Sequence, residues 1–443
     1  GLPARRAALA VLVRVAQGGF ADVLLGHRLT AFPSAADRRL ITRLVLGTLA
    51  WQGRLDYELA RISTRALETL DPEILAILRL ALYQIRIMTR VPQHAAVDTA
   101  VTLARATHGD SGAAGFVNAI LRAALRKPIP LPDRSKDEIG YLTVAYSHPR
   151  WMVERFVAWF GIAAAETLMA ANNDAAPNVI RLNLLHGEAM ALVRRLNEGG
   201  IDATLSSRLR ETAVLTHAPM FESRILREGL CYPQSEVSQL AAAMLGPPPA
   251  ATVVDCAAAP GGKATHLAEM AGREGRVLAL DISRSGLRKV DTIAAMLGHR
   301  HITAIQADCA APMPLRASSF SHVLLDAPCT GSGTLREHPE IRWRLDSHDF
   351  LRMAGLQARM LQQSATLIRP GGVIVYSVCS LAPDEGEGVI NAFLEGHPCF
   401  RVDRTLFSDQ RFDGLIGKDG FMRTRPDQGG LDGFFAARLV RIA

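Results

Sequence analysis

Two short cysteine motifs, fifty residues apart, are the parts of this chain best suited to covalent chemistry. One is Asp326-Ala327-Pro328-Cys329 and the other is Tyr376-Ser377-Val378-Cys379-Ser380. Each closes a run of apolar residues that predicts a buried strand, and a thiolate at a strand end can act as a nucleophile. A buried cysteine is more often a small hydrophobic residue, and that interpretation is adequate for Cys231, Cys256, Cys309 and Cys399. The polar neighbours of Cys329 and Cys379 favour a chemical role for these two.

A glycine-rich turn precedes both motifs and predicts a ligand site. Its small residues let the backbone approach a ligand, and the helix that it opens offers free amides. It lacks the G-x-G-x-x-G pattern, and it is not a P-loop, because Ala257 stands where glycine is needed and Ala264 follows Lys263. An ordinary strand–helix turn is the alternative. The candidate cofactor-binding residues of the turn are Ala257, Ala258, Ala259, Pro260, Gly261, Gly262 and Lys263.

Three aspartates follow successive predicted strands and add to this site. Asp281 ends the second strand, where a carboxylate can accept both hydroxyls of a ribose. Asp308 lies just past the third strand and could meet an adenine amino group, and Asp326 ends the fourth. Asp281 or Asp308 alone could equally be the N-cap of a helix. Together with the glycine turn, the set fits S-adenosylmethionine as the cofactor.

Lys263 is unusual because only five of the fifty basic residues are lysines. A lysine at the start of a helix opposes the helix dipole and is mildly unfavourable. Its ammonium group can reach a substrate ring or a carboxylate, and it could lower the pKa of a nearby thiol. These points indicate a role in the site for Lys263.

A thiolate beside a methyl donor suits methylation of cytosine at C5. That carbon is too weak a nucleophile by itself, but a thiolate that adds to C6 makes C5 an enamine carbon, and later elimination frees the enzyme. The Pro-Cys dipeptide of DNA cytosine-5 methyltransferases would nominate Cys329, but their companion Glu-Asn-Val is absent. The Pro-Pro-aromatic motif of amino-methyltransferases is also not matched. The residues alone leave open which cysteine attacks.

The elements that must position these residues form an alternation of strands and helices from Gly229 onward. The apolar runs predict strands that are buried on both faces, as in a parallel doubly wound sheet, with ligands at the carboxyl ends of the strands. Helices are expected over 266–270 and 354–368. The predicted strands are Thr252–Cys256, Arg276–Asp281, Ile302–Gln306, His322–Asp326, Val373–Val378 and Phe434–Val440.

The first 128 residues read as a separate helical domain. Apolar residues recur every three or four positions over 8–15, 40–49, 74–87 and 97–104. A proline-rich stretch, Lys127 to Pro132, predicts a stiff linker. Residues 135–230 mix expected helices (152–160 and 188–197) with short strands (179–184 and 214–217), which indicates a small α+β module. Residues 231–443 form the third expected domain.

Composition places the chain among globular proteins with a basic N-terminal part. The net charge is +7, and residues 1–128 hold 17 Lys/Arg against 9 Asp/Glu, so the basic excess is N-terminal and suits a phosphate backbone. A solvated arginine-rich surface is the alternative. No C-x-x-C pair occurs, which argues against a cysteine zinc site. No membrane segment or secretory signal is found, although residue 1 is Gly. Dispersed cysteines favour the cytoplasm, and a monomer without metal is expected.

The motifs together resemble the NOP/Sun group of RNA cytosine-5 methyltransferases. The N-terminal helices, residues 1–128, resemble a NusB-like RNA-binding domain, and the resemblance covers almost the whole chain. The fold that it implies is multidomain: an all-α NusB-like domain, a small α+β (ferredoxin- or RRM-like) module and a C-terminal α/β Rossmann-like class I methyltransferase domain. The matching stretches are 258–263, 326–333, 336–343, 356–357, 369–372, 376–380 and 433–435, with 92–94 and 116–122 in the N-terminal part.

The resemblance also implies roles for individual residues. Cys379 would be the nucleophile at C6, and Cys329 would assist product release by helping to remove the C5 proton. Asp326 would hydrogen-bond the cytosine edge, with Lys263 beside it. The turn over 257–263, Asp281, Asp308 and Asp326 would line the S-adenosylmethionine site, and the target base would leave its stack.

Two departures from the family pattern and three functions remain to be weighed. Val378 replaces the usual threonine before the nucleophile, and Cys256 stands one place earlier than the family's frequent cysteine at position 257. The favoured function is methylation of 16S rRNA. The same chemistry on tRNA, or a non-catalytic RNA-binding assembly or antitermination factor, are the alternatives. Intact Cys329, Cys379 and Asp281 argue against a decayed site.

Overall fold

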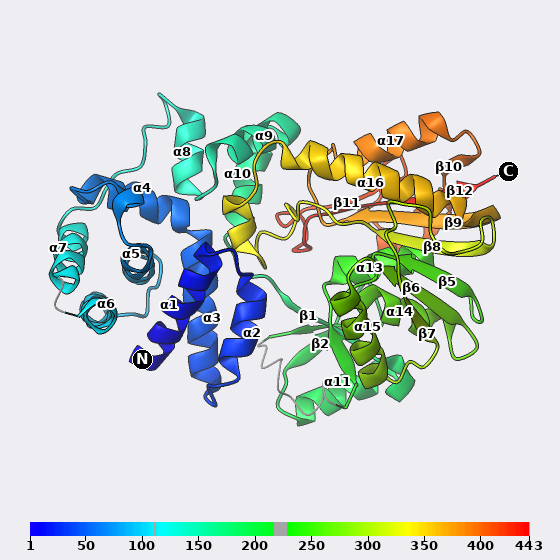
Figure 1. Cartoon of the computed structure of the whole chain (residues 1–443), viewed down its shortest axis with the longest axis horizontal. Helices are drawn as coiled ribbons and strands as arrows, with labels where there is room; N and C mark the ends of the chain where they lie inside the picture. The colour runs from blue at the N-terminus through cyan, green and yellow to red at the C-terminus, as the bar shows by residue number, and fades with distance from the viewer. Residues whose placement is uncertain (110–111, 217–227, 443) are drawn as a thin grey trace. The chain divides into compact units, whose positions relative to one another are not determined.

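The structure is a computed structural model that describes residues 1–109, 112–216 and 228–442. The chain folds into two compact units (Figure 1). The first contains residues 1–175 together with 335–347, and the second contains residues 176–334 and 348–443. Within the described residues, no helix is both long and apolar enough to cross a membrane.

The first unit is helical, and its core is built from the apolar faces that the sequence periodicity predicts. Helix α5 illustrates how its elements begin: Pro72 occupies the first turn, and the Asp71 carboxylate accepts the Glu73 N–H at 2.8 Å. Ile77, Leu78 and Leu82 are fully buried inside it. The helices are α1 (Leu2–Ala16), α2 (Ala21–Leu29), α3 (Ala35–Ala50), α4 (Gln52–Ile62), α5 (Pro72–Arg86), α6 (Gln93–His108), α7 (Ala113–Arg126), α8 (Glu138–Ala145), α9 (Arg150–Phe160) and α10 (Ile162–Ala171).

A segment from late in the sequence, residues 335–347, completes this first unit. Its short 3-10 helix η3 (Pro339–Trp343) carries Arg342, which is fully buried. The Arg342 guanidinium donates to the Ser147 carbonyl at 3.1 Å and to Asn173 Oδ1 at 2.8 Å. Trp343 Nε1 donates to the Leu49 carbonyl at 2.7 Å. These hydrogen bonds anchor the segment between helices that lie far from it in the sequence.

The second unit contains a small antiparallel sheet with strand order β2-β3-β1-β4. Helix α11 (Ala189–Glu198) packs on it, and Ile180, Leu182, Leu196 and Ala213 contribute to their shared core. This is the α+β part of the chain. Its strands are β1 (Asn178–Leu182), β2 (Ala203–Leu205), β3 (Thr212–Leu215) and β4 (Cys231–Pro233).

The larger sheet of the second unit has the order β10-β12-β9-β8-β5-β6-β7, with β11 pairing β12. Strands β5 to β9 are parallel, so their carboxyl ends meet at one edge. The register aligns Cys256 with Leu325, and Asp326 with Ser377. The strands are β5 (Thr252–Cys256), β6 (Arg276–Asp281), β7 (Ile302–Gln306), β8 (Phe320–Asp326), β9 (Ile368–Val378), β10 (Phe400–Val402), β11 (Met422–Thr424) and β12 (Phe434–Arg441).

Helices cover both faces of this sheet (Figure 1). One face packs against helices α13, α14 and α15, and the other against α16 and α17. Alternate residues of β5 follow this division, since Val253 faces the first group and Val254 the second. The helices are α13 (Glu236–Leu245), α14 (Gly262–Ala271), α15 (Arg284–Leu297), α16 (Asp349–Thr366) and α17 (Glu387–Gly396).

The structure departs from the sequence expectations at three elements. The last strand, β12, runs antiparallel to β9, so the sheet is mixed rather than wholly parallel. The helix expected over 354–368 ends at Thr366, and Ile368 instead pairs with Phe320 as the start of β9. The proline and glycines that follow Ile368 conceal that start. In the small sheet, β1 ends at Leu182 and β3 at Leu215, and His217 lies outside the described residues.

Candidate active site

The turn between β5 and α14 adopts the backbone geometry that its small residues permit. Ala257 and Gly261 both have positive φ, at 68° and 119°. A Cβ atom on Gly261 would lie 3.0 Å from the Cα of Val290 in α15, so a larger residue would push the turn away from that helix. The Ala258 N–H donates to the Leu280 carbonyl of the neighbouring strand at 2.8 Å. The turn is therefore held tightly against β6 and α15.

Arg181 of the small sheet fixes the first turn of α14. It is almost fully buried, and it donates to the Gly262 carbonyl at 2.6 Å and to Thr265 Oγ1 at 2.8 Å. It also forms an ion pair with Glu269 at 3.1 Å. The α+β part of the chain thus supports the glycine turn directly, although Arg181 does not itself reach the cysteines.

Asp281 and Asp308 lie at the expected strand ends but in different surroundings. The Asp281 carboxylate is mostly buried and accepts the N–H groups of Ala259 at 3.0 Å and Ser283 at 2.7 Å. Each of its oxygens keeps a lone pair for a further donor. Asp308 is exposed, and its carboxylate accepts the Ala310 N–H at 2.8 Å. Both aspartates therefore also cap the turns that follow their strands.

Lys263 and Asp326 form an ion pair with 2.7 Å between Nζ and Oδ2. The Asp326 Oδ1 atom accepts the Ser377 hydroxyl at 2.7 Å, and Lys263 also donates to Ser238 at 3.3 Å. Burial opposes the charge on Lys263, but the Asp326 carboxylate outweighs it and holds the lysine pKa above its usual value. Lys263 is therefore a cation at neutral pH. The Cys379 sulfur is a second group that raises the pKa of Lys263.

The two candidate cysteines contact each other, with 3.1 Å between their sulfur atoms. They follow the adjacent parallel strands β8 and β9 and are both partly exposed. The hydrogen bond to Cys379 and burial raise the pKa of the Cys329 thiol well above its usual value. The raised pKa keeps Cys329 in its thiol form, and the Cys379 sulfur lies near the positive charge of Lys263.

A buried carboxylate, Glu385, holds the two cysteine loops together. Its Oε1 accepts the Thr330 N–H and the Gln357 amide, both at 2.9 Å, and its Oε2 accepts the Thr330 hydroxyl at 2.6 Å and the Ser380 hydroxyl. The Tyr376 hydroxyl donates to the Glu385 carbonyl. Because each hydrogen bond involves a residue next to Cys329 or Cys379 or a helix beneath them, this network fixes the sulfur positions.

The loop after Cys329 packs backbone to backbone against the start of β12. The Gly433 N–H donates to the Gly333 carbonyl at 2.8 Å. A Cβ atom on Gly333 would lie 2.0 Å from the Gly433 carbonyl oxygen, so no side chain fits there. This close contact explains why glycine stands at positions 333 and 433.

Asp255, next to the last residue of β5, is a buried acid to which the sequence analysis assigned no role. It is fully buried, and neither carboxylate oxygen has a hydrogen-bond partner in the described part of the chain. Burial first, and then the negative charge of Asp326, raise its pKa well above the usual value. Asp255 thus lies beneath the glycine turn and binds its proton more strongly in the folded protein than in the unfolded chain.

We expect the protonation of Asp255 to make stability depend on pH. The folded state holds the proton to a higher pH than the unfolded state does, so this contribution to stability falls as pH rises above the usual aspartate range. One pKa unit corresponds to about 1.4 kcal/mol. From about pH 4 to about pH 8, the free energy of unfolding of Asp255→Asn should therefore rise relative to that of the parent by at least this amount, as measured by urea unfolding. Asp291→Asn, on the exposed face of α15, is the control, and parallel pH profiles for Asp255→Asn and the parent would contradict the assignment.

We also expect the cysteine pair to be sensitive to peroxide. The sulfurs are 3.1 Å apart, so a movement of about 1 Å gives the length of a disulfide bond. Peroxide would oxidise one thiolate to a sulfenic acid, and the second thiol would displace water to form the disulfide. Mass mapping should find the peptide of Cys329 joined to that of Cys379, and dithiothreitol should restore both thiols. The link should form in Cys399→Ser, and its absence there and in the parent would contradict the expectation.

The structure thus brings four predicted residues into one group: Lys263, Asp326, Cys329 and Cys379. It places the turn over 257–263 and Asp281 beside one another through the Ala259 hydrogen bond. Sequence reasoning missed the supporting residues Arg181, Ser377, Glu385 and Asp255. Glu385 lies in an acidic stretch that is typical of an exposed loop, and Arg181 is one arginine among many, so neither carried a signal of its own.

Comparisons with known proteins find relatives for each part of the chain. Residues 242–440 match the family described as 16S rRNA methyltransferase RsmB/F. Residues 2–126 match the NusB family, and residues 148–221 match the ferredoxin-like domain of RsmF/B-like methyltransferases.

Full-length relatives give the same result. The chain is 31% identical to the probable ribosomal RNA small subunit methyltransferase B of Bacillus subtilis, over 98% of both chains. It is 35% identical to ribosomal RNA small subunit methyltransferase B of Thermus thermophilus, over 99% of this chain and 98% of the relative. Among solved structures, PH0851 is 27% identical with a TM-score of 0.87, covering 100% of this chain and 99% of that one.

Proposed function

Because this chain belongs to the RsmB/F family of 16S rRNA methyltransferases, we propose that it methylates C5 of a cytosine in 16S rRNA through a covalent bond between Cys379 and C6 of the base. The observation that carries the proposal is the pair of sulfurs 3.1 Å apart beside the Lys263–Asp326 ion pair. A catalytic cysteine alone would serve many reactions, whereas two facing thiols suit one step of addition and one of elimination.

The methyl donor that fits this site is S-adenosylmethionine, whose sulfonium supplies an electrophilic methyl group. The Asp281 carboxylate has free lone pairs for ribose hydroxyls, and its position is fixed by Ala259 and Ser283. The buried oxygens of Asp255 have no partner in the described part of the chain, as expected beneath a polar ligand. The turn over 257–263, the exposed Asp308 and the partly buried Asp326 would complete the site.

In the addition step, Cys379 is the nucleophile. Lys263 places a positive charge near its sulfur, and that sulfur in turn raises the lysine pKa. As the sulfur bonds to C6, negative charge develops on the pyrimidine ring. Asp326, held by Lys263 and Ser377, would hydrogen-bond the cytosine edge, and Lys263 would stabilise the added charge.

In the release step, Cys329 takes the proton from C5, and elimination then breaks the bond between C6 and the Cys379 sulfur. The pKa of Cys329 is raised first by its hydrogen bond to Cys379, with burial and the charge of that sulfur adding to it. Once Cys379 has bonded to carbon, both effects of its sulfur disappear. Cys329 can then lose its own proton to solvent and act as a base, so the order of the steps follows from the pair itself.

The N-terminal helices would supply the electrostatic contact with RNA, since 17 Lys/Arg stand against 9 Asp/Glu in residues 1–128. The substrate, 16S rRNA, implies a cytoplasmic location. The same chemistry on tRNA is the second candidate.

The proposal is tested by incubating the full-length protein and S-adenosylmethionine with unmodified 16S rRNA and with bulk tRNA. Bisulfite sequencing then maps 5-methylcytosine, with Cys379→Ala as control. We expect one protected cytosine in 16S rRNA that is lost in the variant. Protection only in tRNA would overturn the substrate, and protection in neither RNA would overturn the proposed reaction.

A further inference from the structure

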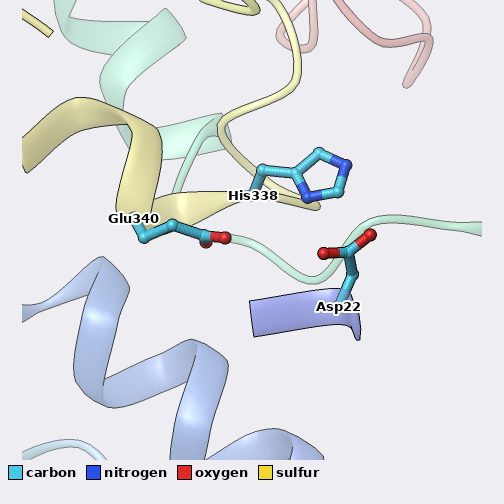
Figure 2. Close-up of side chains that lie close together, drawn as sticks. All are labelled: Asp22, His338 and Glu340. Carbon is cyan, nitrogen blue, oxygen red and sulfur yellow. The ribbon is translucent and has the colours of Figure 1, made fainter. Parts of the chain in front are cut away.

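Three side chains of the first unit converge where the late segment 335–347 meets the beginning of α2. Asp22 lies in the first turn of α2, His338 precedes η3, and Glu340 lies within η3. One ligand atom from each lies within 4.8 Å of those of the other two. Figure 2 shows the carboxylates of Asp22 and Glu340 pointing toward one another, with the His338 ring beside them.

Glu340 is the member of this cluster that points to a missing ligand. Only 1% of it is exposed. Its Oε1 accepts the Ala21 N–H at 2.9 Å, at the positive end of the α2 dipole. Its Oε2 is buried and has no hydrogen-bond partner in the described part of the chain. An ionised carboxylate with one orphaned buried oxygen is costly unless a cation compensates it.

The neighbouring arginines are already occupied. The Arg344 guanidinium donates to the Val15 carbonyl at 3.1 Å and lies 5.0 Å from the centre of the Phe20 ring. Arg342 donates to carbonyl and amide oxygens of the helices around it. The Nη atoms of Arg342 and the Nη2 atom of Arg344 donate to these other acceptors, and no hydrogen bond reaches the second oxygen of Glu340 in the described part of the chain.

We propose that Asp22, His338 and Glu340 bind a divalent transition-metal cation of the Zn²⁺ type, with water in the remaining position. One imidazole nitrogen and two carboxylate oxygens suit such an ion, whose bonds of about 2.0–2.2 Å would draw the ligand atoms together. The two carboxylates neutralise its double charge, and Glu340 Oε2 acquires its partner. No cysteine takes part, so the absence of C-x-x-C pairs does not bear on this site.

Such an ion would fasten the late segment to helix α2. The segment directly follows the loop of Cys329 in the chain, since Thr334 precedes Leu335. Its attachment now depends on hydrogen bonds such as Ala21 to Glu340. Metal binding adds bonds that exist only in the folded state, so it stabilises that state by mass action.

The test uses full-length protein freed of metal by a chelator and then titrated with ZnCl₂. Bound Zn²⁺ is counted after desalting, and thermal unfolding is followed with and without the ion. The parent and His94→Ala, an exposed histidine on α6, should hold one more Zn²⁺ per chain than Asp22→Asn or His338→Ala. Loss of one ligand should weaken this site at least about tenfold. Zinc should raise the unfolding temperature of the parent and His94→Ala more than that of the variants.

The comparison is built so that other zinc-binding groups cancel, because every protein retains all six cysteines. Equal Zn²⁺ counts in the parent and in Asp22→Asn would overturn the proposal. Asp22 is exposed, so Asp22→Asn keeps the test decisive even where His338→Ala folds poorly. The measurement does not involve methyl transfer, so its result is independent of the proposed reaction.

Discussion

Replacing Cys379 with alanine should reduce methyl transfer by at least about four orders of magnitude, because the reaction then loses the step that activates C5. We expect Cys329 not to replace it in the addition step, because burial and the nearby Glu385 carboxylate still oppose the Cys329 thiolate when the Cys379 sulfur is gone. The measurement is the initial rate of transfer of a labelled methyl group from S-adenosylmethionine to 16S rRNA.

Two matched variants separate loss of chemistry from loss of structure. Cys399→Ala removes a partly buried thiol that follows α17 in the sequence, whereas the cysteine pair precedes that helix. This variant should retain the parent rate. The free energy of unfolding of Cys379→Ala should stay within about 1 kcal/mol of that of the parent, because only one sulfur atom is lost from a partly exposed site. Turnover within tenfold of the parent would reject Cys379 as the nucleophile and favour Cys329.

The surroundings of the two cysteines, Lys263 among them, could not be predicted from the two cysteine motifs alone. The Pro-Cys dipeptide nominates Cys329 in the sequence, and nothing in the spacing of the two motifs decides between the cysteines. The folded chain breaks that symmetry. The Cys379 sulfur is coupled to the Lys263 cation, whereas Cys329 lies near the buried Glu385 carboxylate. The raised pKa disfavours the Cys329 thiolate, which agrees with the proposal that Cys379 attacks.

The strands β5, β6 and β7 have the predicted bounds. Strands β5 and β6 are mostly buried apolar runs, as expected. Strand β7 lies at the edge of the sheet and none of its residues is fully buried, so the expectation of burial on both faces was wrong for it. The antiparallel direction of β12 was not predictable, because strand direction depends on the path of the chain through α17 and β10. A largely apolar run of residues such as β12 looks the same in either direction.

The supporting residues were hidden for a different reason. Arg181 and Glu385 act through partners 81 and 55 positions away, Gly262 and Thr330. Arg342 is buried by helices 170 to 195 positions earlier in the chain. A single sequence shows residue types and local spacing, but it does not show which distant carbonyl or amide a charged side chain will meet. These residues therefore look like ordinary surface charges until the fold is known.

Replacing Cys329 with alanine should trap the enzyme on its RNA instead of merely slowing it. Addition and methyl transfer need only Cys379, so the first turnover proceeds to the methylated adduct. Without Cys329, the C5 proton has no nearby base, and elimination of the Cys379 sulfur stalls. The expected result is a covalent protein–RNA complex that survives denaturing electrophoresis and contains one labelled methyl group per protein.

The trapped complex tests both roles at once. It forms only if Cys379 adds to the base and Cys329 is needed for its release. The double variant Cys329→Ala/Cys379→Ala should form no complex. The variant Cys329→Ser should form the complex, as Cys329→Ala does, since a serine hydroxyl is too weak an acid to ionise there. Rapid turnover by Cys329→Ala without a complex would show that another group removes the proton. Asp326 would then be the group to test, since its carboxylate is already held beside the pair by Lys263 and Ser377.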